Sequence, residues 1–305
     1  MCCGGGHNSE VIGAYLAVLR RRRYSAKTLQ TYGNALEHFV AFIGNARLQD
    51  VDAAQVEAWR LHLVKRGLAP ASLEVFLRAA RLLFNWLEET GQLFLNPCRD
   101  LVVPKYPRKL LPVPTQDEMM RLLARPNTAL PLGLRDRALL ETAYATGARR
   151  DELVRMTIFD PDLPASGGPG SGTVRIQGKG NKERVVPLGR HAAHWIQRYF
   201  EIARPRLAGN AIDQESLWIG WRAVAMSGQA MNVQVKRHAA DAGIKMTVSL
   251  HALRRACATH MLQHGAHPLQ IQMLLGHATM KHLSQYLRLS ITDLKKMHQR
   301  SKPGK

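Results

Sequence analysis

A histidine and an arginine in one short segment have the residue types and spacing that chemistry on a phosphate group could use. The segment "HALRRACATH" places His251 and Arg254 three residues apart, so both side chains project from the same side of a helix. Arginine suits a phosphate because its planar guanidinium donates two parallel hydrogen bonds and keeps its charge. The pair could therefore stabilise the charge that develops during phosphoryl transfer, although it could also be an ordinary surface pair.

Two further segments offer cations for the same purpose. In "ATGARRDEL", Arg149 follows a glycine at the end of an apolar helical pattern, and the adjacent Arg150 leaves open which of the two would face a phosphate. In "GKGNKER", Lys179 lies between two glycines, in a turn that could bring an ammonium group into a groove. The order Gly-Lys-Gly does not match a nucleotide-binding loop, in which Ser or Thr follows the lysine.

A candidate nucleophile closes a fourth segment. The stretch "LLGHATMKHLSQY" ends in Tyr286, nine residues after His277, and this tyrosine could be a packing residue or a nucleophile held beside a histidine. The sequence has neither the clustered carboxylates of a metal-dependent nuclease nor a zinc-ligand spacing. We therefore expect chemistry that runs on side chains, with no metal and no cofactor.

Taken in this order, the four segments resemble the signature segments of the tyrosine recombinase (phage integrase) family, close to its Xer-like bacterial branch. The resemblance covers nearly the whole chain, and four ordered motifs are far more specific than any one of them. It implies a DNA strand transferase that cleaves and rejoins strands in site-specific recombination or integration, through a 3′-phosphotyrosyl intermediate. A phosphotyrosyl bond keeps the energy of the broken phosphodiester, so rejoining would need no ATP.

The resemblance also assigns roles by position. It implies that the catalytic residues are Arg149, Lys179, His251, Arg254, His277 and Tyr286. Lys179 would protonate the departing 5′ oxygen and Tyr286 would attack phosphorus, while the arginines and histidines surround the phosphate. Glu152, three residues after the first arginine, matches an acid that supports that arginine.

The charge of the chain predicts a polyanionic partner. Its 43 Lys and Arg residues against 23 Asp and Glu give a formal charge of +20, which favours nucleic acid first and an anionic membrane surface second. Residues 1–95 hold only 11 basic and 8 acidic residues, so most of the excess lies further along the chain. The expected DNA-contacting residues are Arg20, Arg21, Arg22, Arg23, Lys27, Lys182 and Arg184. The arginine run could instead be a solvated face.

The elements that position these residues are expected to be mainly helical. Within residues 1–95, four amphipathic segments predict a small helical bundle, and Ser25 is the predicted N-cap of the second segment. A proline-rich, basic stretch then predicts a linker at residues 96–112, followed by a capping box from Thr115 to Glu118. The resemblance implies that residues 1–95 form a SAM-like core-binding domain and residues 113–305 the catalytic domain.

The second domain is expected to combine helices with one small antiparallel sheet. The segment "GTVRIQGKGNKERVVPLG" alternates Val174, Ile176 and then Val185 around a glycine-rich turn, which predicts a β-hairpin. Helical patterns precede and follow it. The expected fold class is thus mainly α (α+β), with an N-terminal helical bundle and a C-terminal mixed α domain.

Cysteine use and hydropathy predict the compartment. The 4 cysteines show no disulfide or metal-ligand spacing, and neither a signal peptide nor a membrane-spanning run is visible. We expect a cytoplasmic, nucleoid-associated protein without membrane contact. The resemblance implies double-stranded DNA recombination sites as partner and a homotetramer on synapsed DNA.

Two alternatives remain open at this point, a type IB-like topoisomerase and a non-catalytic DNA-binding protein of the same fold. The helical bundle and the short chain favour a recombinase over a topoisomerase. A protein that only binds DNA has no need for all six catalytic residues. The DNA site itself could belong to a transposon, an integron, a phage or a chromosome-dimer site.

Overall fold

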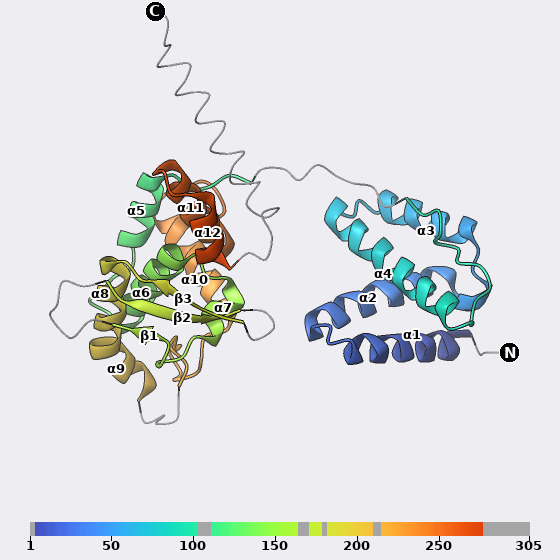
Figure 1. Ribbon diagram of the computed structural model, residues 1–305, viewed down its shortest axis with the longest axis horizontal. Coiled ribbons are helices and arrows are strands. Elements are labelled where there is room, and N and C mark those ends of the chain that lie inside the picture. The colour runs from blue at the N-terminus through green and yellow to red at the C-terminus, as the bar shows by residue number, and fades with distance from the viewer. Residues whose placement is uncertain (1–3, 103–110, 164–170, 179–181, 210–214, 277–305) are drawn as a thin grey trace, which may run out of the picture. The chain divides into compact units, whose positions relative to one another are not determined.

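The computed structural model describes residues 4–102, 111–163, 171–178, 182–209 and 215–276 (Figure 1). The chain divides into two compact units, residues 1–109 and 110–305, called here the N-terminal and the C-terminal unit. Among the described residues, no helix combines the length and the apolar character that crossing a bilayer requires. The predicted fold class, mainly α with one small antiparallel sheet, is confirmed.

The N-terminal unit is the predicted bundle of amphipathic helices. Its helices are α1 (Gly4–Arg21), α2 (Ala26–Ile43), a 3-10 turn (Leu48–Asp50), α3 (Ala53–Lys65) and α4 (Pro70–Glu89). Ser25 is the N-cap of α2, as predicted, and its hydroxyl accepts a hydrogen bond from the Thr28 amide at 3.2 Å. Leu36 and Phe39 of α2 are fully buried, so the apolar stripe seen in the sequence faces the core.

Aromatic side chains fill the centre of this bundle. The Phe39 ring lies edge-on to the Trp59 ring, with centroids 4.7 Å apart, and packs against Phe84 at 5.8 Å. Cys98 and Leu101 are buried in the same cluster, so packing of the unit continues past the end of α4. The predicted domain limits at residues 95 and 112 stay a prediction.

The C-terminal unit carries the remaining elements. They are α5 (Gln116–Ala124), α6 (Pro131–Thr146), α7 (Arg150–Arg155), β1 (Pro161–Asp162), β2 (Thr173–Gln177), β3 (Glu183–Pro187), α8 (Arg190–Arg198), a π-helix (Tyr199–Ala203), α9 (Arg204–Ala208), α10 (Gly228–Asp241), α11 (Leu250–Gln263) and α12 (Pro268–Leu275). The predicted capping box at α5 is present: the Glu118 amide donates to the Thr115 hydroxyl at 3.2 Å, and the Thr115 amide donates to the Glu118 carboxylate at 2.8 Å.

Helix α6 is the central element of this unit, and both α8 and α11 pack on it (Figure 1). Even its charged residues are buried. Asp136, only 1% exposed, accepts hydrogen bonds from Arg135 Nη2 at 2.6 Å and pairs with His238 Nε2 of α10 at 2.8 Å. This buried pairing satisfies the carboxylate and joins α6 to α10.

The hairpin forms where the sequence predicts it, but with a different inward face. Strands β2 and β3 pair antiparallel, with Val174 opposite Val186 and Ile176 opposite Arg184. The expectation that Val185 alternates with the buried residues is wrong, because Val185 is 67% exposed and Val186 is 2% exposed. The short strand β1, which extends the sheet to three strands in the order β1-β2-β3, was not predicted.

Gly147 fixes how closely α6 and α12 approach. It ends α6 in the left-handed conformation (φ 57°), and a Cβ atom there would lie 2.5 Å from Leu275 Cδ2. Gly243 has a similar φ of 69° but open space around it. A comparison of the two positions therefore distinguishes the effect of backbone strain, which both share, from that of a steric clash, which only Gly147 has.

We predict that Gly147→Ala destabilises the protein by about 2–4 kcal/mol, because strain and overpacking add. Gly243→Ala, the matched control, should cost only about 1 kcal/mol, since strain acts alone. Urea denaturation of the full chain measures both losses. Equal losses for the two variants would contradict the proposed close approach.

Candidate active site

Arg254 joins the C-terminal ends of two helices. This arginine of α11 is 3% exposed, and its Nη1 donates to the Gly147 carbonyl oxygen at 2.5 Å, just past the end of α6. Its Nη2 donates to the Leu275 carbonyl oxygen at 2.7 Å, in the last turn of α12. Carbonyl groups at a helix C-terminus lack intrahelical partners and carry partial negative charge, so a guanidinium satisfies them well.

Two more arginines reach the same end of α12. Arg149, which precedes α7, donates from Nη1 to the Leu275 carbonyl oxygen at 3.5 Å and from Nη2 to that of Gly276 at 3.3 Å. Arg184 of β3 donates from Nε to the Leu274 carbonyl oxygen at 2.9 Å. Arginines from the N-cap of α7, from β3 and from α11 therefore converge on one helix end, although the chain separates them widely.

Glu152 holds two of these arginines. Its side chain is 2% exposed, and it accepts hydrogen bonds from the Arg149 amide and Arg149 Nη1, both at 2.8 Å. Arg184 adds Nη1 at 3.2 Å and Nη2 at 2.8 Å. Burial by itself raises the pKa of this carboxyl, but the hydrogen bonds and charges of Arg184 and Arg149 outweigh burial and lower the pKa to about 2.

His251 lies in the first turn of α11 and is exposed. Burial of part of the ring lowers the pKa of His251, and so do the charges of Arg254, Arg255, Arg149 and Arg150, in that order of effect. A pKa lowered in this way favours the neutral form of the imidazole at neutral pH. This arrangement suits the binding of a phosphate.

The neighbouring residues Arg149 and Arg150 have different surroundings. Arg149 is joined to Glu152 and to the end of α12, and its side chain is still 40% exposed. Arg150 pairs through Nε with Asp151 at 2.9 Å, and its stem lies against Gly228, where a Cβ atom would come within 2.7 Å of it. The structure thus connects Arg149, and not Arg150, to Glu152 and α12.

The structure describes only some of the other residues predicted for the site. Lys179, His277 and Tyr286 lie outside the described residues. The residues predicted to contact DNA from the N-terminal unit are all exposed: Arg20, Arg21, Arg22, Arg23 and Lys27. Lys182 is also exposed, but the Arg184 side chain is only 15% exposed and binds Glu152. Contact of these residues with DNA stays a prediction.

The sequence interpretation missed the inward orientation of Arg184, although a signal for it exists. Residues two apart in a strand share a face, so Arg184 points the same way as the buried Val186. Its strand partner Ile176 is likewise buried. A correct choice between the two adjacent valines would have placed this arginine against the core.

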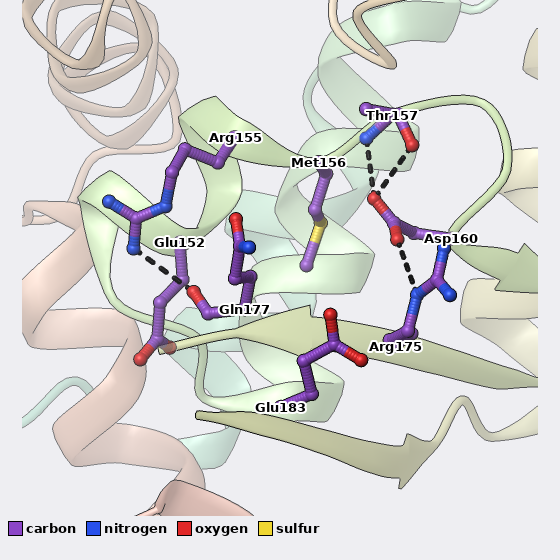
Figure 2. A pocket seen from close by; sticks show the side chains of 8 residues that line it. All are labelled: Glu152, Arg155, Met156, Thr157, Asp160, Arg175, Gln177 and Glu183. Atoms are coloured by element: carbon purple, nitrogen blue, oxygen red, sulfur yellow. Dashed lines mark hydrogen bonds and ion pairs between the residues drawn. The ribbon is translucent and has the colours of Figure 1, made fainter. Parts of the chain in front are cut away.

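A cavity of about 230 Å³ borders Glu152. Figure 2 shows its lining side chains, which come from α7, the turn after it and the hairpin: Glu152, Arg155, Met156, Thr157, Asp160, Arg175, Gln177 and Glu183. Arg155 Nη2 donates to the Gln177 carbonyl oxygen at 3.0 Å, and Arg175 Nε donates to Asp160 at 3.1 Å. These pairs fasten the hairpin to α7 and to the turn that follows it.

In the described part of the chain, no group of three or more His, Cys, Asp or Glu residues could hold a metal ion.

Comparison with known proteins identifies the family. The profile described as "Phage integrase family" matches residues 113–292, and that of the "Phage integrase, N-terminal SAM-like domain" matches residues 13–92. The chain belongs to the phage integrase family. It is a tyrosine recombinase of the Xer-like branch, and the predicted SAM-like character of the N-terminal bundle is confirmed.

Relatives of this tyrosine recombinase match it over nearly their full length. Tyrosine recombinase XerD of Shewanella oneidensis is 36% identical over 281 residues, which span 92% of this chain and 91% of that protein. Tyrosine recombinase XerC of Salmonella typhi is 35% identical over 298 residues, 95% of each chain. The match therefore includes both units.

Solved structures share the fold at lower identity. The XerH recombinase bound to a palindromic difH substrate, a post-cleavage complex, has a TM-score of 0.75 at 21% identity and covers 92% of this chain and 81% of its own. The lambda integrase tetramer bound to a Holliday junction has a TM-score of 0.72 at 18% identity, and the match covers 91% of this chain and 76% of the integrase chain.

We predict that Glu152→Gln makes the tyrosine recombinase less sensitive to acid. The folded protein lowers the pKa of Glu152 from 4.5 to about 2, so its ionised form stabilises the native state above pH 4.5, and this stabilisation is lost as pH falls toward 2. The full effect is about 3 kcal/mol, of which about 2 kcal/mol should be lost between pH 5 and pH 3.

Urea denaturation at several pH values measures this difference. The exposed residue Glu183 begins the strand that carries Arg184, and Glu183→Gln is the matched control. The control should keep the acid sensitivity of the wild type. An unchanged pH dependence in Glu152→Gln would contradict the strong pairing of this carboxylate.

Proposed function

We propose that this tyrosine recombinase performs site-specific DNA recombination, cleaving and rejoining strands through a 3′-phosphotyrosyl intermediate with Tyr286 as nucleophile. The observation that carries the proposal is the convergence of Arg149 and Arg254 at the end of α12, with His251 in their combined field. The arginines donate there to carbonyl oxygens with partial negative charge. A scissile phosphate carries a full negative charge and is a better acceptor for the same donors.

The reaction follows from these charges. The Tyr286 oxygen attacks phosphorus in line and gives its proton to the neutral imidazole of His251, the bond to the 5′ oxygen breaks, and Lys179 gives a proton to that oxygen. Arg149 and Arg254 stabilise the additional negative charge of the pentavalent transition state. Rejoining reverses each step, with a 5′ hydroxyl as nucleophile and Tyr286 as leaving group.

His251 and His277 complete the proposed site. The pKa of His251 is lowered in the free protein, so its neutral imidazole is able to accept a proton. A phosphate bound between the arginines favours the protonated form, which then donates a hydrogen bond to a non-bridging oxygen. His277 follows Gly276 in the chain, and its role rests on the sequence motif alone.

The partner is proposed to be duplex DNA, bound by a homotetramer. Support comes from the lambda integrase tetramer on a Holliday junction and from the XerH complex with its difH substrate. In the N-terminal unit, the exposed side chains Arg20 to Arg23 and Lys27 are proposed to contact the phosphate backbone. Lys182 would do so in the C-terminal unit.

The two alternatives receive less support. A type IB topoisomerase would relax supercoiled DNA as a monomer, and a binding protein would form no covalent adduct. Both are disfavoured by the similarity to XerD and XerC over more than nine-tenths of the chain. Recombination between two sites on one plasmid separates all three functions.

We predict that Tyr286→Phe abolishes the covalent protein–DNA adduct while leaving folding and DNA affinity nearly unchanged, because only one oxygen is removed. The substrate is a nicked duplex that carries the recombination site, which is identified by sequencing DNA recovered from covalent complexes. A denaturing gel detects the adduct, and peptide mapping locates it.

Tyr144→Phe is the matched control and should form the adduct normally. Burial raises the pKa of Tyr144 to about 12, and its hydroxyl is hydrogen-bonded to His260 Nδ1 at 2.8 Å. Tyr199 is similarly engaged, since its hydroxyl donates to the Leu217 carbonyl oxygen at 2.8 Å. An adduct that persists in Tyr286→Phe, or maps to Tyr144 or Tyr199, would refute the assignment.

We predict that Lys179→Ala slows cleavage of a normal phosphodiester by on the order of 10²–10⁴-fold, the usual contribution of a general acid. In a substrate with sulfur at the 5′-bridging position, the thiolate leaves without needing a proton. This substrate should therefore restore much of the cleavage rate that Lys179→Ala loses. Single-turnover cleavage of both substrates measures this ratio. If the sulfur substrate gives no relative gain, another residue is the acid, and Lys182 is the next candidate.

A further inference from the structure

Arg184 is an arginine of the site that has no catalytic role assigned to it. Its guanidinium makes three hydrogen bonds within the protein, from Nε to the Leu274 carbonyl oxygen and from both terminal nitrogens to Glu152. We propose that Arg184 is a positioning residue, which fixes the guanidinium of Arg149 through Glu152. This inference rests on the proposed function and adds a residue to it.

The strand holds Arg184 in this position. Arg184 lies opposite the buried Ile176, on the inward face of the hairpin, and its side chain is 15% exposed. A Cβ atom on Gly276 would come within 3.0 Å of Arg184 Nη1, so the guanidinium lies directly against the left-handed turn that ends α12. A side chain at residue 276 would therefore crowd this guanidinium, and the glycine avoids that contact.

The carboxylate of Glu152 is shared evenly between two arginines. Its Oε1 accepts from Arg149 Nη1 at 2.8 Å and from Arg184 Nη1 at 3.2 Å. Its Oε2 accepts from the Arg149 amide at 2.8 Å and from Arg184 Nη2 at 2.8 Å. Each oxygen thus has one donor from each arginine, which fixes both the position and the rotation of the carboxylate.

Sharing the carboxylate also keeps Arg149 available to a phosphate. Without Arg184, the buried charge of Glu152 would have a single guanidinium as partner and would draw Arg149 more strongly toward itself. The pair of Arg149 and Glu152 would then be neutral, whereas the three residues together carry one net positive charge. Arg184 therefore maintains both the orientation and the charge that Arg149 presents.

The test compares single-turnover cleavage and DNA affinity in the full chain. Arg184→Ala should slow cleavage by on the order of 10–100-fold, because a displaced guanidinium loses alignment with the transition state. Arg184→Lys restores the charge but not the planar fork, so it should bind DNA with nearly wild-type affinity and still cleave slowly. If Arg184 only stabilised the fold, its substitution would not lower the cleavage rate while leaving the affinity for DNA unchanged.

A double-mutant cycle tests the route through Glu152. In a Glu152→Gln background, Arg184→Ala should slow cleavage by less than about 3-fold further, because the shared partner is already removed. If Arg184 acted only through its hydrogen bond to Leu274, Arg184→Ala would slow cleavage by its full factor in the Glu152→Gln variant as well. Should Arg184→Ala fail to fold, as judged by thermal unfolding, the cycle is run with Arg184→Lys.

Arg175→Ala is the matched control. Arg175 lies on the partner strand of the same hairpin, but it pairs with Asp160 and makes no contact with Glu152 that the structure describes. The Arg175→Ala variant should cleave DNA at the wild-type rate. Wild-type cleavage by Arg184→Ala, or independent effects of Arg184→Ala and Glu152→Gln, would overturn the proposal. Absence of any adduct in the wild type would instead refute the proposed function.

Discussion

A buried carboxylate must be matched by positive charge, and in this protein that requirement organises the site. Glu152 is 2% exposed and accepts four hydrogen bonds from two arginines, one before α7 and one in β3. The cost of burying the charge is offset only if both guanidiniums stay in place. The helix and the hairpin are therefore held in one arrangement by the same interaction that orients Arg149.

The ends of two helices impose the second constraint. Helix α6 ends at Gly147 and α12 ends at Gly276, both in the left-handed conformation, and each leaves carbonyl oxygens without intrahelical partners. Arg254 donates to Gly147 and to Leu275, so the two ends share one guanidinium. Because the arginines proposed to bind the phosphate satisfy these carbonyls, the candidate site and the packing of α12 are parts of one structure.

Local patterns in the sequence predict most of the elements but not their convergence. Ser25 and the Thr115 capping box mark helix starts because capping depends on nearby residues. Local pattern cannot decide which of the adjacent valines Val185 and Val186 faces the core, because either fits an alternating strand, and only the strand register, with Val174 opposite Val186, decides between them. The pairing of Arg184 with Glu152 joins residues 32 positions apart, and the spacing of motifs carries no information about it.

The charges at the end of α12 suit a transition state better than a substrate. Arg149, Arg184 and Arg254 contribute three positive charges and Glu152 removes one, while the lowered pKa of His251 keeps that ring neutral. The described groups of this cluster thus leave a net charge of about +2. A phosphodiester carries one negative charge, and the pentavalent state of the proposed reaction carries two. The cluster therefore gains more electrostatic energy from the transition state than from the bound DNA, as catalysis requires.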